Sequence, residues 1–301
     1  MSRKSNQKKD MLVSVVIPTY KRSNYIQRAV NSVIDQTYKI MEILIIDDNG
    51  AGNKYQIETE KKINELAKRH KNIKYILHNE NRGAPAARNT GILNANGECI
   101  AFLDDDDYWK SNKIKEQVKF LDEYDIVLTG SVYINSQYKF PEFKKKEITA
   151  DDLKKRNYGG TTSSLLIRKR VLIQYMFDIE LKKSQDYDLY IRLSQNYRIK
   201  YINKPLVVFD YNIHRERITN QMLKTDIDIC HYKEYYNFYD KHRDFFGEKK
   251  YKYHLAYMYL DSIALRKDKI KHIMKVVKIF GVYYPGKVML NKLLFRFFGK
   301  P

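Results

Sequence analysis

The sequence predicts an α/β protein whose sheet, mainly parallel but mixed overall, is covered by helices on both faces. Four short apolar runs, at residues 12–17, 41–46, 73–77 and 98–103, alternate with helical patterns. Each run is almost wholly apolar, which is typical of parallel strands buried on both faces. The 301 residues are 43% hydrophobic, which is enough for a large core and excludes a disordered chain.

The first half of the chain alternates strand and helix in a regular order. The first run is rich in β-branched residues and stops at Pro18. A helix over 23–36 follows, with apolar residues at helical spacing and Ser23 as a candidate N-cap. We then expect strand 41–46, helix 54–69, strand 73–77, helix 84–95, strand 98–103 and a helix that starts near Ser111.

The second half is less regular. We expect strands at 125–134, 162–167 and 207–211 and a helix at 186–195. From about residue 217 the pattern is helical and rich in Tyr and Lys. The simplest division is a polar tail at 1–10, one α/β domain at 11–215 and a helical basic extension at 216–301.

Composition limits the partners and the compartment. Fifty-six basic and 36 acidic residues leave a net charge of +20, which favours nucleic acid, anionic lipid or phosphorylated ligands. Cys99 and Cys230 are the only cysteines, and Cys99 falls in an expected buried strand, so we expect no disulfide framework. Neither a secretory signal nor a run of about 18 apolar residues is present. We therefore expect a cytoplasmic protein, with peripheral contact at the inner face of the cell membrane left open.

Four consecutive aspartates, Asp104–Asp107, follow the strand expected at 98–103. Like charges at a few Å repel, so a cation among them or a shared proton would relieve the strain. Oxygen-rich clusters suit Mg²⁺ and Mn²⁺, whereas a solvated turn that caps the next helix is the structural alternative. Pro18–Tyr20 and Asp47-Asp48 follow two other expected strands. Because ligands of such sheets bind beyond the carboxyl ends of the strands, these positions favour a site over a turn.

An ordered series of motifs resembles the family 2 glycosyltransferases, inverting enzymes with the GT-A fold. The series comprises Val13 to Tyr20, Ile45 to Asp48, Asn81-Arg82-Gly83 with Ala87-Arg88-Asn89, Leu103 to Asp107, and Gln185-Asp186. The resemblance covers roughly residues 11–215. It implies a Rossmann-like domain that binds a nucleotide sugar, most simply a UDP-sugar, and that uses Mn²⁺ or Mg²⁺ as cofactor. A cation there would stabilise the negative charge that develops on the leaving diphosphate.

The resemblance also assigns roles to the acids of the first half. Asp106 is expected to contact the metal directly, while Asp104 and Asp105 face the ribose or reach the metal through water. Asp107 is expected to be a helix cap. Asp48 is the acid expected to accept a hydrogen bond from the N–H of uracil. For Asp47 two roles remain open, a contact with the ribose and the orientation of the turn.

Further residues complete the nucleotide-sugar site that the resemblance implies. Pro18, Thr19 and Tyr20 form the loop that holds the base. Arg82 and Arg88 could bind phosphate through their guanidinium groups, although each could equally be a solvated surface arginine. His214 is a candidate third metal ligand or a structural histidine.

The catalytic base of the family is an acid near the start of a helix, which matches Asp186 here. Such a base deprotonates the attacking hydroxyl as the nucleotide leaves. Gln185 departs from the family pattern, in which Glu is commoner at this position. Asp188 is a rival base, and an acid in the first turn of a helix also has a structural explanation. Gly159-Gly160-Thr161-Thr162 is either part of the acceptor site or an ordinary turn.

The C-terminal residues 266–301 contain ten Lys or Arg and one acid, a net charge of +9. Apolar residues recur there at helical spacing beside the lysines, which suits an anionic membrane surface. The alternative is a helix that packs its apolar stripe on the catalytic α/β domain, with the lysines merely solvated. Membrane contact would suit a lipid-linked sugar as acceptor.

The leading hypothesis is therefore a transferase that adds a single sugar to a glycan or lipid-linked acceptor in bacterial surface polysaccharide synthesis. The Gln-x-x-Arg-Trp signature of processive synthases is absent, which argues against polymerisation. A catalytically inactive relative that only binds a glycan is the first alternative. A nucleic-acid-binding protein is the second, but no motif for nucleic acid supports it.

Overall fold

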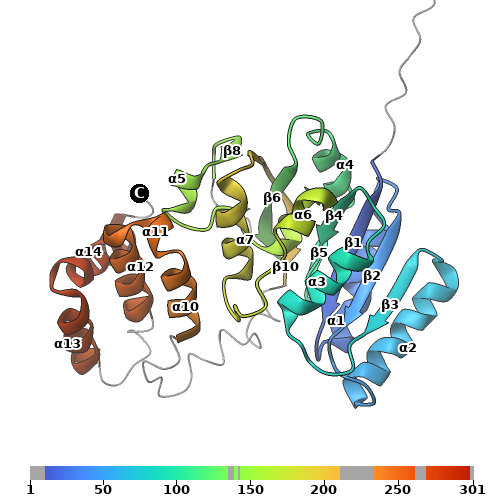
Figure 1. The fold of residues 1–301 in the computed structure, drawn as a ribbon, viewed down its shortest axis with the longest axis horizontal. Coiled ribbons are helices and arrows are strands. Elements are labelled where there is room, and N and C mark those ends of the chain that lie inside the picture. The colour runs from blue at the N-terminus through green and yellow to red at the C-terminus, as the bar shows by residue number, and fades with distance from the viewer. Residues whose placement is uncertain (1–10, 135–138, 142, 211–232, 262–268, 299–301) are drawn as a thin grey trace, which may run out of the picture. The chain divides into compact units, whose positions relative to one another are not determined.

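The computed structural model describes residues 11–134, 139–141, 143–210, 233–261 and 269–298 (Figure 1). The chain divides into two compact units, one of Met1–Glu180 with Gln185–Tyr211 and one of Leu181–Ser184 with Asn212–Pro301. The expected domain boundary after residue 215 lies outside the described residues.

The first unit is α/β. Its elements are β1 (Val13–Thr19), α1 (Ser23–Ile34), β2 (Glu42–Asp47), α2 (Lys54–Arg69), β3 (Ile73–Leu77), α3 (Ala84–Asn94), β4 (Cys99–Phe102), β5 (Asp107–Trp109), α4 (Lys113–Val118), β6 (Ile126–Tyr133), β7 (Lys139–Phe140), β8 (Glu147–Ile148), α5 (Ala150–Leu153), the 3₁₀-helix η1 (Thr162–Ser164), β9 (Leu166–Arg168), α6 (Lys169–Gln174), α7 (Gln185–Ser194) and β10 (Ile199–Phe209).

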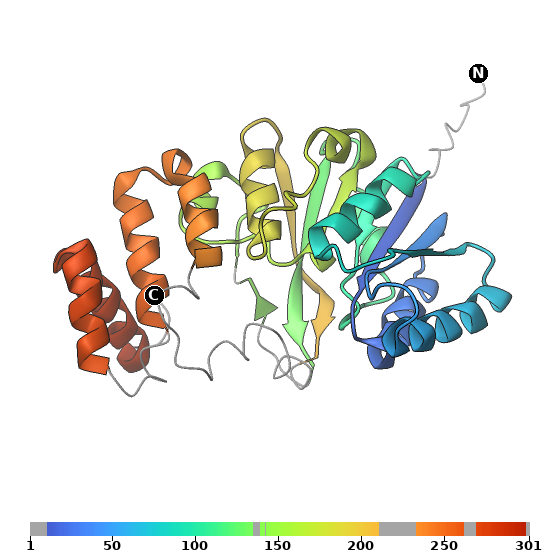
Figure 2. The ribbon, with the colours of Figure 1, turned by 60° about the horizontal axis from the view of Figure 1, so that its bottom comes forward.

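The ten strands in the described part of the chain belong to one mixed sheet with the order β3-β2-β1-β4-β9-β6-β10-β5, and β7 and β8 pair with β6 and β10. The first four strands in the chain are parallel to one another. Strand β9 is antiparallel to both of its neighbours, whereas β6 and β10 are parallel. These two long strands run side by side as the green and gold arrows of Figure 2. The predicted mixed sheet is confirmed.

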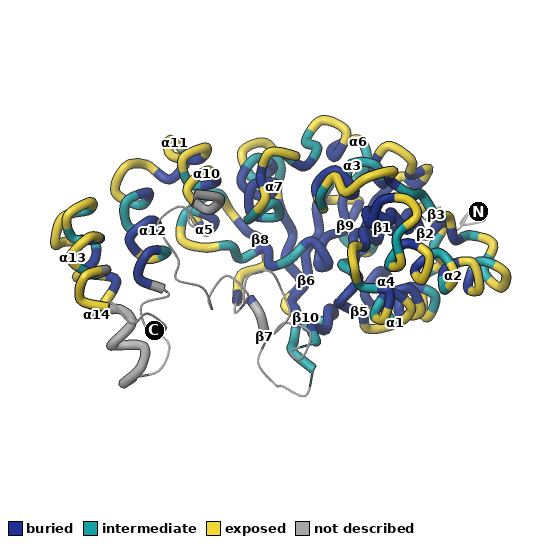
Figure 3. Tube along the Cα trace, turned by 90° about the horizontal axis from the view of Figure 1, so that it is seen from below, coloured by how far each residue is buried: buried dark blue, intermediate teal, exposed yellow. Residues whose placement is uncertain are grey.

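Helices cover both faces of this sheet, as the sequence predicts. Helices α3 and α6 lie on one face, and α1 and α4 lie on the other (Figure 3). Every residue of β1, β2 and β4 is buried. Their continuous apolar runs follow from this arrangement, because side chains that point to either face enter a core.

Two details at the start of the fold differ from the sequence prediction. Strand β1 continues through Pro18 to Thr19, since β4 pairs with β1 only as far as Val16 and the missing N–H of Pro18 faces no partner on that side. Ser23 is the first residue of α1 rather than its N-cap. Its hydroxyl instead donates to Glu58 Oε2 at 2.7 Å.

The second half of the first unit shows the larger differences. The strand expected at 162–167 is a 3₁₀ turn followed by the short β9. The strand expected at 207–211 is the end of the 11-residue β10, which has register shifts between Ile202 and Val207. Asn203, Lys204 and Pro205 lie at this irregularity and read as a turn in the sequence, which explains why the prediction was too short.

The second unit is helical. Its described elements are α10 (Lys233–Lys241), α11 (Arg243–Phe246), α12 (Glu248–Asp261), α13 (Lys269–Phe280) and α14 (Tyr283–Phe298). Helix α12 packs against each of the others. None of the described helices is both long enough and apolar enough to cross a bilayer.

Candidate active site

The carboxyl ends of β1, β2 and β4 meet at one edge of the sheet. The hydroxyl of Thr19, at the end of β1, donates to Asp105 Oδ2 at 2.7 Å. The backbone N–H of Asp48, just after β2, donates to the carbonyl oxygen of Thr19 at 2.9 Å. The parallel strands thus bring the loop 18–20, the pair Asp47-Asp48 and the acids after β4 together, as expected from their position.

Two arginines hold the acids that follow β4. Arg22 Nη1 lies 2.5 Å from Asp106 Oδ2 and 3.2 Å from Asp105 Oδ1. Arg88 Nη2 lies 2.7 Å from Asp104 Oδ1. Asp105 and Asp106 are buried and Asp104 is partly exposed, so these guanidinium groups compensate carboxylates that have little contact with water.

The acid cluster retains an electrostatic strain despite the arginines. The pKa of Asp105 is raised to about 7: burial is the largest cause and the charges of Asp106 and Asp104 add to it, while Arg22 and the Thr19 hydroxyl act in the opposite direction. Arg22 belongs to the site, although the sequence did not indicate it. Its position two residues after Tyr20 is the signal that could have done so.

Asp107 is not a helix cap, contrary to the sequence prediction. It is the first residue of β5, and helix α4 begins only at Lys113, after Asn112. The Asp107 carboxylate is fully buried and accepts a hydrogen bond of 2.7 Å from the Ser163 hydroxyl. It joins β5 to η1.

Asp47 and Asp48 organise the loops beside them. Asp47 Oδ1 accepts from Asn49 N at 2.8 Å, and its Oδ2 accepts from the Tyr75 hydroxyl at 2.7 Å. Burial raises the pKa of Asp47, while these hydrogen bonds lower it. These contacts match the orientation of the turn, one of the two roles left open for Asp47.

The carboxylate of Asp48 makes four contacts, two at each oxygen. Oδ1 contacts His78 Nδ1 at 2.7 Å and Arg82 N at 2.8 Å. Oδ2 accepts from Asn81 Nδ2 and from Gly83 N, both at 2.8 Å. A carboxylate has about four lone-pair positions, so the expected contact with a uracil N–H requires one of these partners to move.

The other residues expected around the nucleotide differ in exposure. Pro18 is buried, whereas Tyr20 is 38% exposed and has Lys21 Nζ 4.9 Å from its ring centroid. The side chain of Arg82 is exposed, and its backbone N–H binds Asp48. Tyr20 is thus available at the surface for a base, and the exposure of Arg82 fits both alternatives left open for it, a phosphate ligand and a solvated arginine.

Asp186 is in the first turn of α7. Its carboxylate accepts hydrogen bonds from Tyr187 N at 2.8 Å and from Asn157 Nδ2 at 3.2 Å. The pKa of Asp186 is raised to about 6 because the effect of burial outweighs the N–H of Tyr187 and the charge of Arg88, which lower it. A carboxylate with this pKa is ionised at neutral pH and is a stronger base than an ordinary aspartate.

The rival acid, Asp188, is differently placed. It is fully buried, and its Oδ2 accepts from Arg192 Nε at 2.9 Å and Arg192 Nη2 at 2.8 Å. This i,i+4 ion pair gives Asp188 a structural role within α7. Burial and a tight cationic partner both disfavour Asp188 as an acceptor of a substrate proton.

The diglycine loop places Asn157 beside Asp186. A Cβ atom on Gly159 would lie 2.3 Å from Cδ2 of Tyr190, so only glycine lets this loop approach α7. Gly160 has φ of +73°, and its carbonyl oxygen accepts from Asn157 Nδ2 at 3.0 Å. The loop therefore serves the geometry of the candidate base. The sequence itself did not indicate Asn157.

Arg88 links the acid motif to the base helix. Its Nη2 binds Asp104, and its Nη1 donates to Gln185 Oε1 at 2.9 Å. The guanidinium carbon lies 5.4 Å from the centroid of the Phe177 ring. Arg88 and Gln185 are 97 positions apart in the chain. Gln185, where the family favours Glu, suits this role because its amide oxygen accepts the hydrogen bond without adding another negative charge.

The acids after β4 have the ligand type that a divalent cation needs. Carboxylate oxygens are the ligands that Mg²⁺ and Mn²⁺ prefer. Within the described part of the chain, no group of three or more potential ligands already converges as a metal site. His214 lies outside the described residues. The Asp106 oxygen 2.5 Å from Arg22 is open to a cation only when that arginine moves away.

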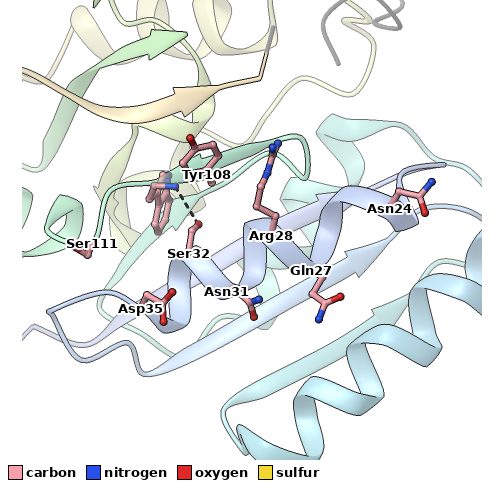
Figure 4. A pocket seen from close by; sticks show the side chains of 9 residues that line it. Asn24, Gln27, Arg28, Asn31, Ser32, Asp35, Tyr108 and Ser111 are labelled. Atoms are coloured by element: carbon pink, nitrogen blue, oxygen red, sulfur yellow. Dashed lines mark hydrogen bonds between the residues drawn. The ribbon is translucent and has the colours of Figure 1, made fainter. Parts of the chain in front are cut away.

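A separate cavity of about 600 Å³ lies between α1 and β5 (Figure 4). Its wall includes Arg28, Tyr108 and Ser32, whose hydroxyl accepts from Trp109 N at 3.1 Å. None of the residues expected in the site lines it. Arg28 joins the two regions, because its Nη2 donates to the Asp106 carbonyl oxygen at 2.9 Å and its Nη1 to Asp210 Oδ2 at 2.7 Å.

Comparison with known proteins gives the family. The family model described as "Glycosyl transferase family 2" matches residues 14–178, more than half of the chain. WcaA of Escherichia coli (strain K12), a glycosyl transferase assigned by name to colanic acid biosynthesis, is 30% identical over 84% of this chain and 88% of its own length. WfgD of Escherichia coli, named "UDP-Glc:alpha-D-GlcNAc-diphosphoundecaprenol beta-1,3-glucosyltransferase", is 29% identical over 71% of this chain and 82% of its own.

The solved structures agree in fold. The crystal structure of S. aureus TarS superposes with a TM-score of 0.57 at 22% sequence identity, and covers 93% of this chain. The chain spans about half, 53%, of that structure. A structure of TarS 1–349 in complex with UDP-GlcNAc gives a TM-score of 0.57 at 20% identity, over 94% of this chain and 92% of the other. The strand order, the mixed sheet and these likenesses confirm the predicted GT-A type fold, and the chain belongs to glycosyltransferase family 2.

Proposed function

We propose that this glycosyltransferase moves a single sugar from a UDP-sugar to a hydroxyl of a lipid-linked glycan, with inversion at the anomeric carbon. The observation that supports this most strongly is the link through Arg88, which ties Asp104 of the acid motif to Gln185 beside Asp186. A donor-binding acid and a candidate base are thereby held in one network, as a displacement reaction requires.

Asp186 is the proposed base. The acceptor oxygen attacks the anomeric carbon, the bond from that carbon to the diphosphate oxygen breaks, and the acceptor proton passes to Asp186. With a pKa of about 6, Asp186 is largely ionised at neutral pH and can take this proton. The N–H groups of Asn157 and Tyr187 orient the carboxylate.

Asp104 and Asp106 are proposed to hold a divalent cation. When bound, Mn²⁺ or Mg²⁺ supplies positive charge against the leaving diphosphate. Arg22, which now bridges Asp105 and Asp106, is expected to release Asp106 when the cation is present. Its guanidinium then becomes available for the phosphates, as does that of the exposed Arg82.

The proposed donor and acceptor follow the relatives. TarS was solved with UDP-GlcNAc, and the name of WfgD specifies a UDP-glucose donor and a diphosphoundecaprenol-linked acceptor. WcaA of Escherichia coli is assigned by name to colanic acid biosynthesis. TuaG of Bacillus subtilis is assigned by name to teichuronic acid biosynthesis. By this likeness, we place the chain in the synthesis of a bacterial surface polysaccharide.

A donor panel tests this proposal. Hydrolysis and transfer are measured with UDP-, GDP- and dTDP-sugars, each with Mn²⁺, with Mg²⁺ and with EDTA, against lipid-linked sugar acceptors. We expect turnover of a UDP-sugar that EDTA abolishes. Turnover that survives EDTA would contradict the metal assignment, and a panel in which no nucleotide sugar binds or reacts would contradict the proposed activity.

A further inference from the structure

Helix α13 has an inward face and an outward face, and both contain apolar residues. On the inward face, Val276 is 1% exposed and the Phe280 ring lies 5.6 Å from that of Tyr259 on α12. On the outward face, Ile270 is 80% exposed and Met274 is 63% exposed. Helix α13 thus packs on α12 of its own unit with only part of its apolar surface, and the rest of that surface is exposed (Figure 3).

Cations alternate with these exposed apolar residues. Lys271, Lys275 and Lys278 are exposed, and their spacing of four and three residues places them on one side of the helix, next to Ile270 and Met274. From residue 269 to residue 298 the sequence contains seven Lys or Arg and no Asp or Glu. The outward face therefore combines apolar side chains with lysines and contains no acidic residue.

The same combination continues into the start of α14. Val282 is 74% exposed, Tyr283 59% and Leu290 56%. Lys287 is exposed one helical turn after Tyr283 and one turn before Leu290. A tyrosine with an exposed ring beside lysines is typical of side chains at the boundary between water and lipid.

We propose that this outward surface of α13 and the start of α14 (Ile270 to Lys278, and Val282 to Leu290) docks on an anionic phospholipid bilayer. Apolar side chains can enter the headgroup region while neighbouring lysines bind lipid phosphates, which explains why both kinds of residue share one face. Nucleic acid would use the lysines but gives no role to Ile270 or Met274. The absence of acids over the whole segment leaves no repulsion from an anionic surface.

This surface lies outside the candidate active site, and the inference does not depend on which sugar is transferred. It implies that the enzyme attaches to the membrane by contact with the lipid surface. Lysines near an anionic bilayer each strengthen binding by about fivefold, and the exposed apolar side chains add to this.

Flotation of the full chain with lipid vesicles tests the proposal. Vesicles of pure phosphatidylcholine are compared with vesicles that contain a third phosphatidylglycerol, at low and high salt. The triple variant Lys271→Gln, Lys275→Gln, Lys278→Gln removes the cations, and Ile270→Asn with Met274→Asn removes apolar contacts. The matched control removes three exposed lysines of the first unit, Lys61→Gln, Lys68→Gln and Lys71→Gln.

We expect the wild type to float only with anionic vesicles and to dissociate at high salt. The triple lysine variant should bind on the order of 100-fold more weakly, the apolar variant about tenfold more weakly, and the control as the wild type. The salt and lipid dependence of the wild type needs no variant and stands even if a variant folds poorly. Failure to float, equal binding to neutral vesicles, or an equal loss in the control would overturn the proposal. If the wild type does not bind vesicles but forms a dimer, and the apolar variant is a monomer, a second copy of the chain covers this surface instead.

Discussion

Replacing Asn157 with alanine should shift the acid limb of the pH–activity profile to higher pH. Asn157 Nδ2 donates a hydrogen bond to the ionised form of Asp186, and a donor to the charged form lowers the pKa of a carboxyl group. Its removal must therefore raise the pKa of Asp186 above its present value of about 6. The reaction requires Asp186 as a base, so activity is lost as the pH falls through that pKa.

The size of the shift follows from the geometry. The N···O distance is 3.2 Å, at the long end for a hydrogen bond, so we assign it about 1 kcal/mol. One pKa unit corresponds to 1.36 kcal/mol, which predicts an upward shift of about 0.7 unit. At pH 5, the variant should then have a further three- to fivefold lower kcat/KM than the wild type, while the two converge above pH 8 apart from any constant factor.

The assay is kcat/KM for sugar transfer between pH 5 and 8.5, because this parameter reports the pKa of the free enzyme. Asp151→Asn, a change in an exposed acid of α5, serves as the control for altered surface charge. An acid limb in the wild type near the ordinary aspartate pKa of 4 would refute the reasoning. So would a limb in the Asn157→Ala variant that stays in place or moves to lower pH.

Three further predictions follow from the contacts of the site. Arg22→Ala removes the guanidinium that bridges Asp105 and Asp106. Mn²⁺ should therefore raise the melting temperature of this variant more than that of the wild type. An equal or smaller rise would contradict the exchange between arginine and metal. Asp188→Asn breaks a buried ion pair and should lower the free energy of unfolding, measured by urea denaturation, by about 2–3 kcal/mol. The kcat of the folded fraction should stay near that of the wild type. A large loss of kcat would restore Asp188 as a candidate base. Gly159→Ala places a Cβ atom 2.3 Å from the Tyr190 ring and should cost about 1–3 kcal/mol and lower activity, whereas Gly286→Ala in α14, with open space around it, should do neither.

The sequence predicted the first half of the fold well because one physical rule governs it. Strands β1, β2 and β4 are buried on both faces, so each appears as an uninterrupted apolar run between helical patterns. The signal is weaker where strands are short or irregular. Strand β5 has only three residues, too few to show an alternation of apolar and polar residues. Pro205 lies in the irregular part of β10, and in the sequence it is typical of a turn.

Motifs in the sequence suggest candidate acids for the site, but they do not show which side chains meet those acids in space. The acids at Asp104–Asp106 and Asp186 follow from motif order. The contacts of Arg22 and Arg88 with those acids depend on how loops distant in the sequence approach one another, which no spacing in the sequence encodes. In the sequence, Asp107 looks like the last member of one run of four acids. In the structure it is the first residue of β5 and accepts a hydrogen bond from Ser163.

The most direct test of the proposed mechanism is the transfer rate of Asp186→Asn with a UDP-sugar that the wild type uses, beside Asp151→Asn as the matched change in an exposed acid. Loss of a general base typically costs about 10²- to 10⁴-fold in kcat. We predict a loss of that size for Asp186→Asn with UDP affinity, measured by calorimetry, unchanged, and no loss for Asp151→Asn. Transfer by Asp186→Asn at the wild-type rate would contradict the account.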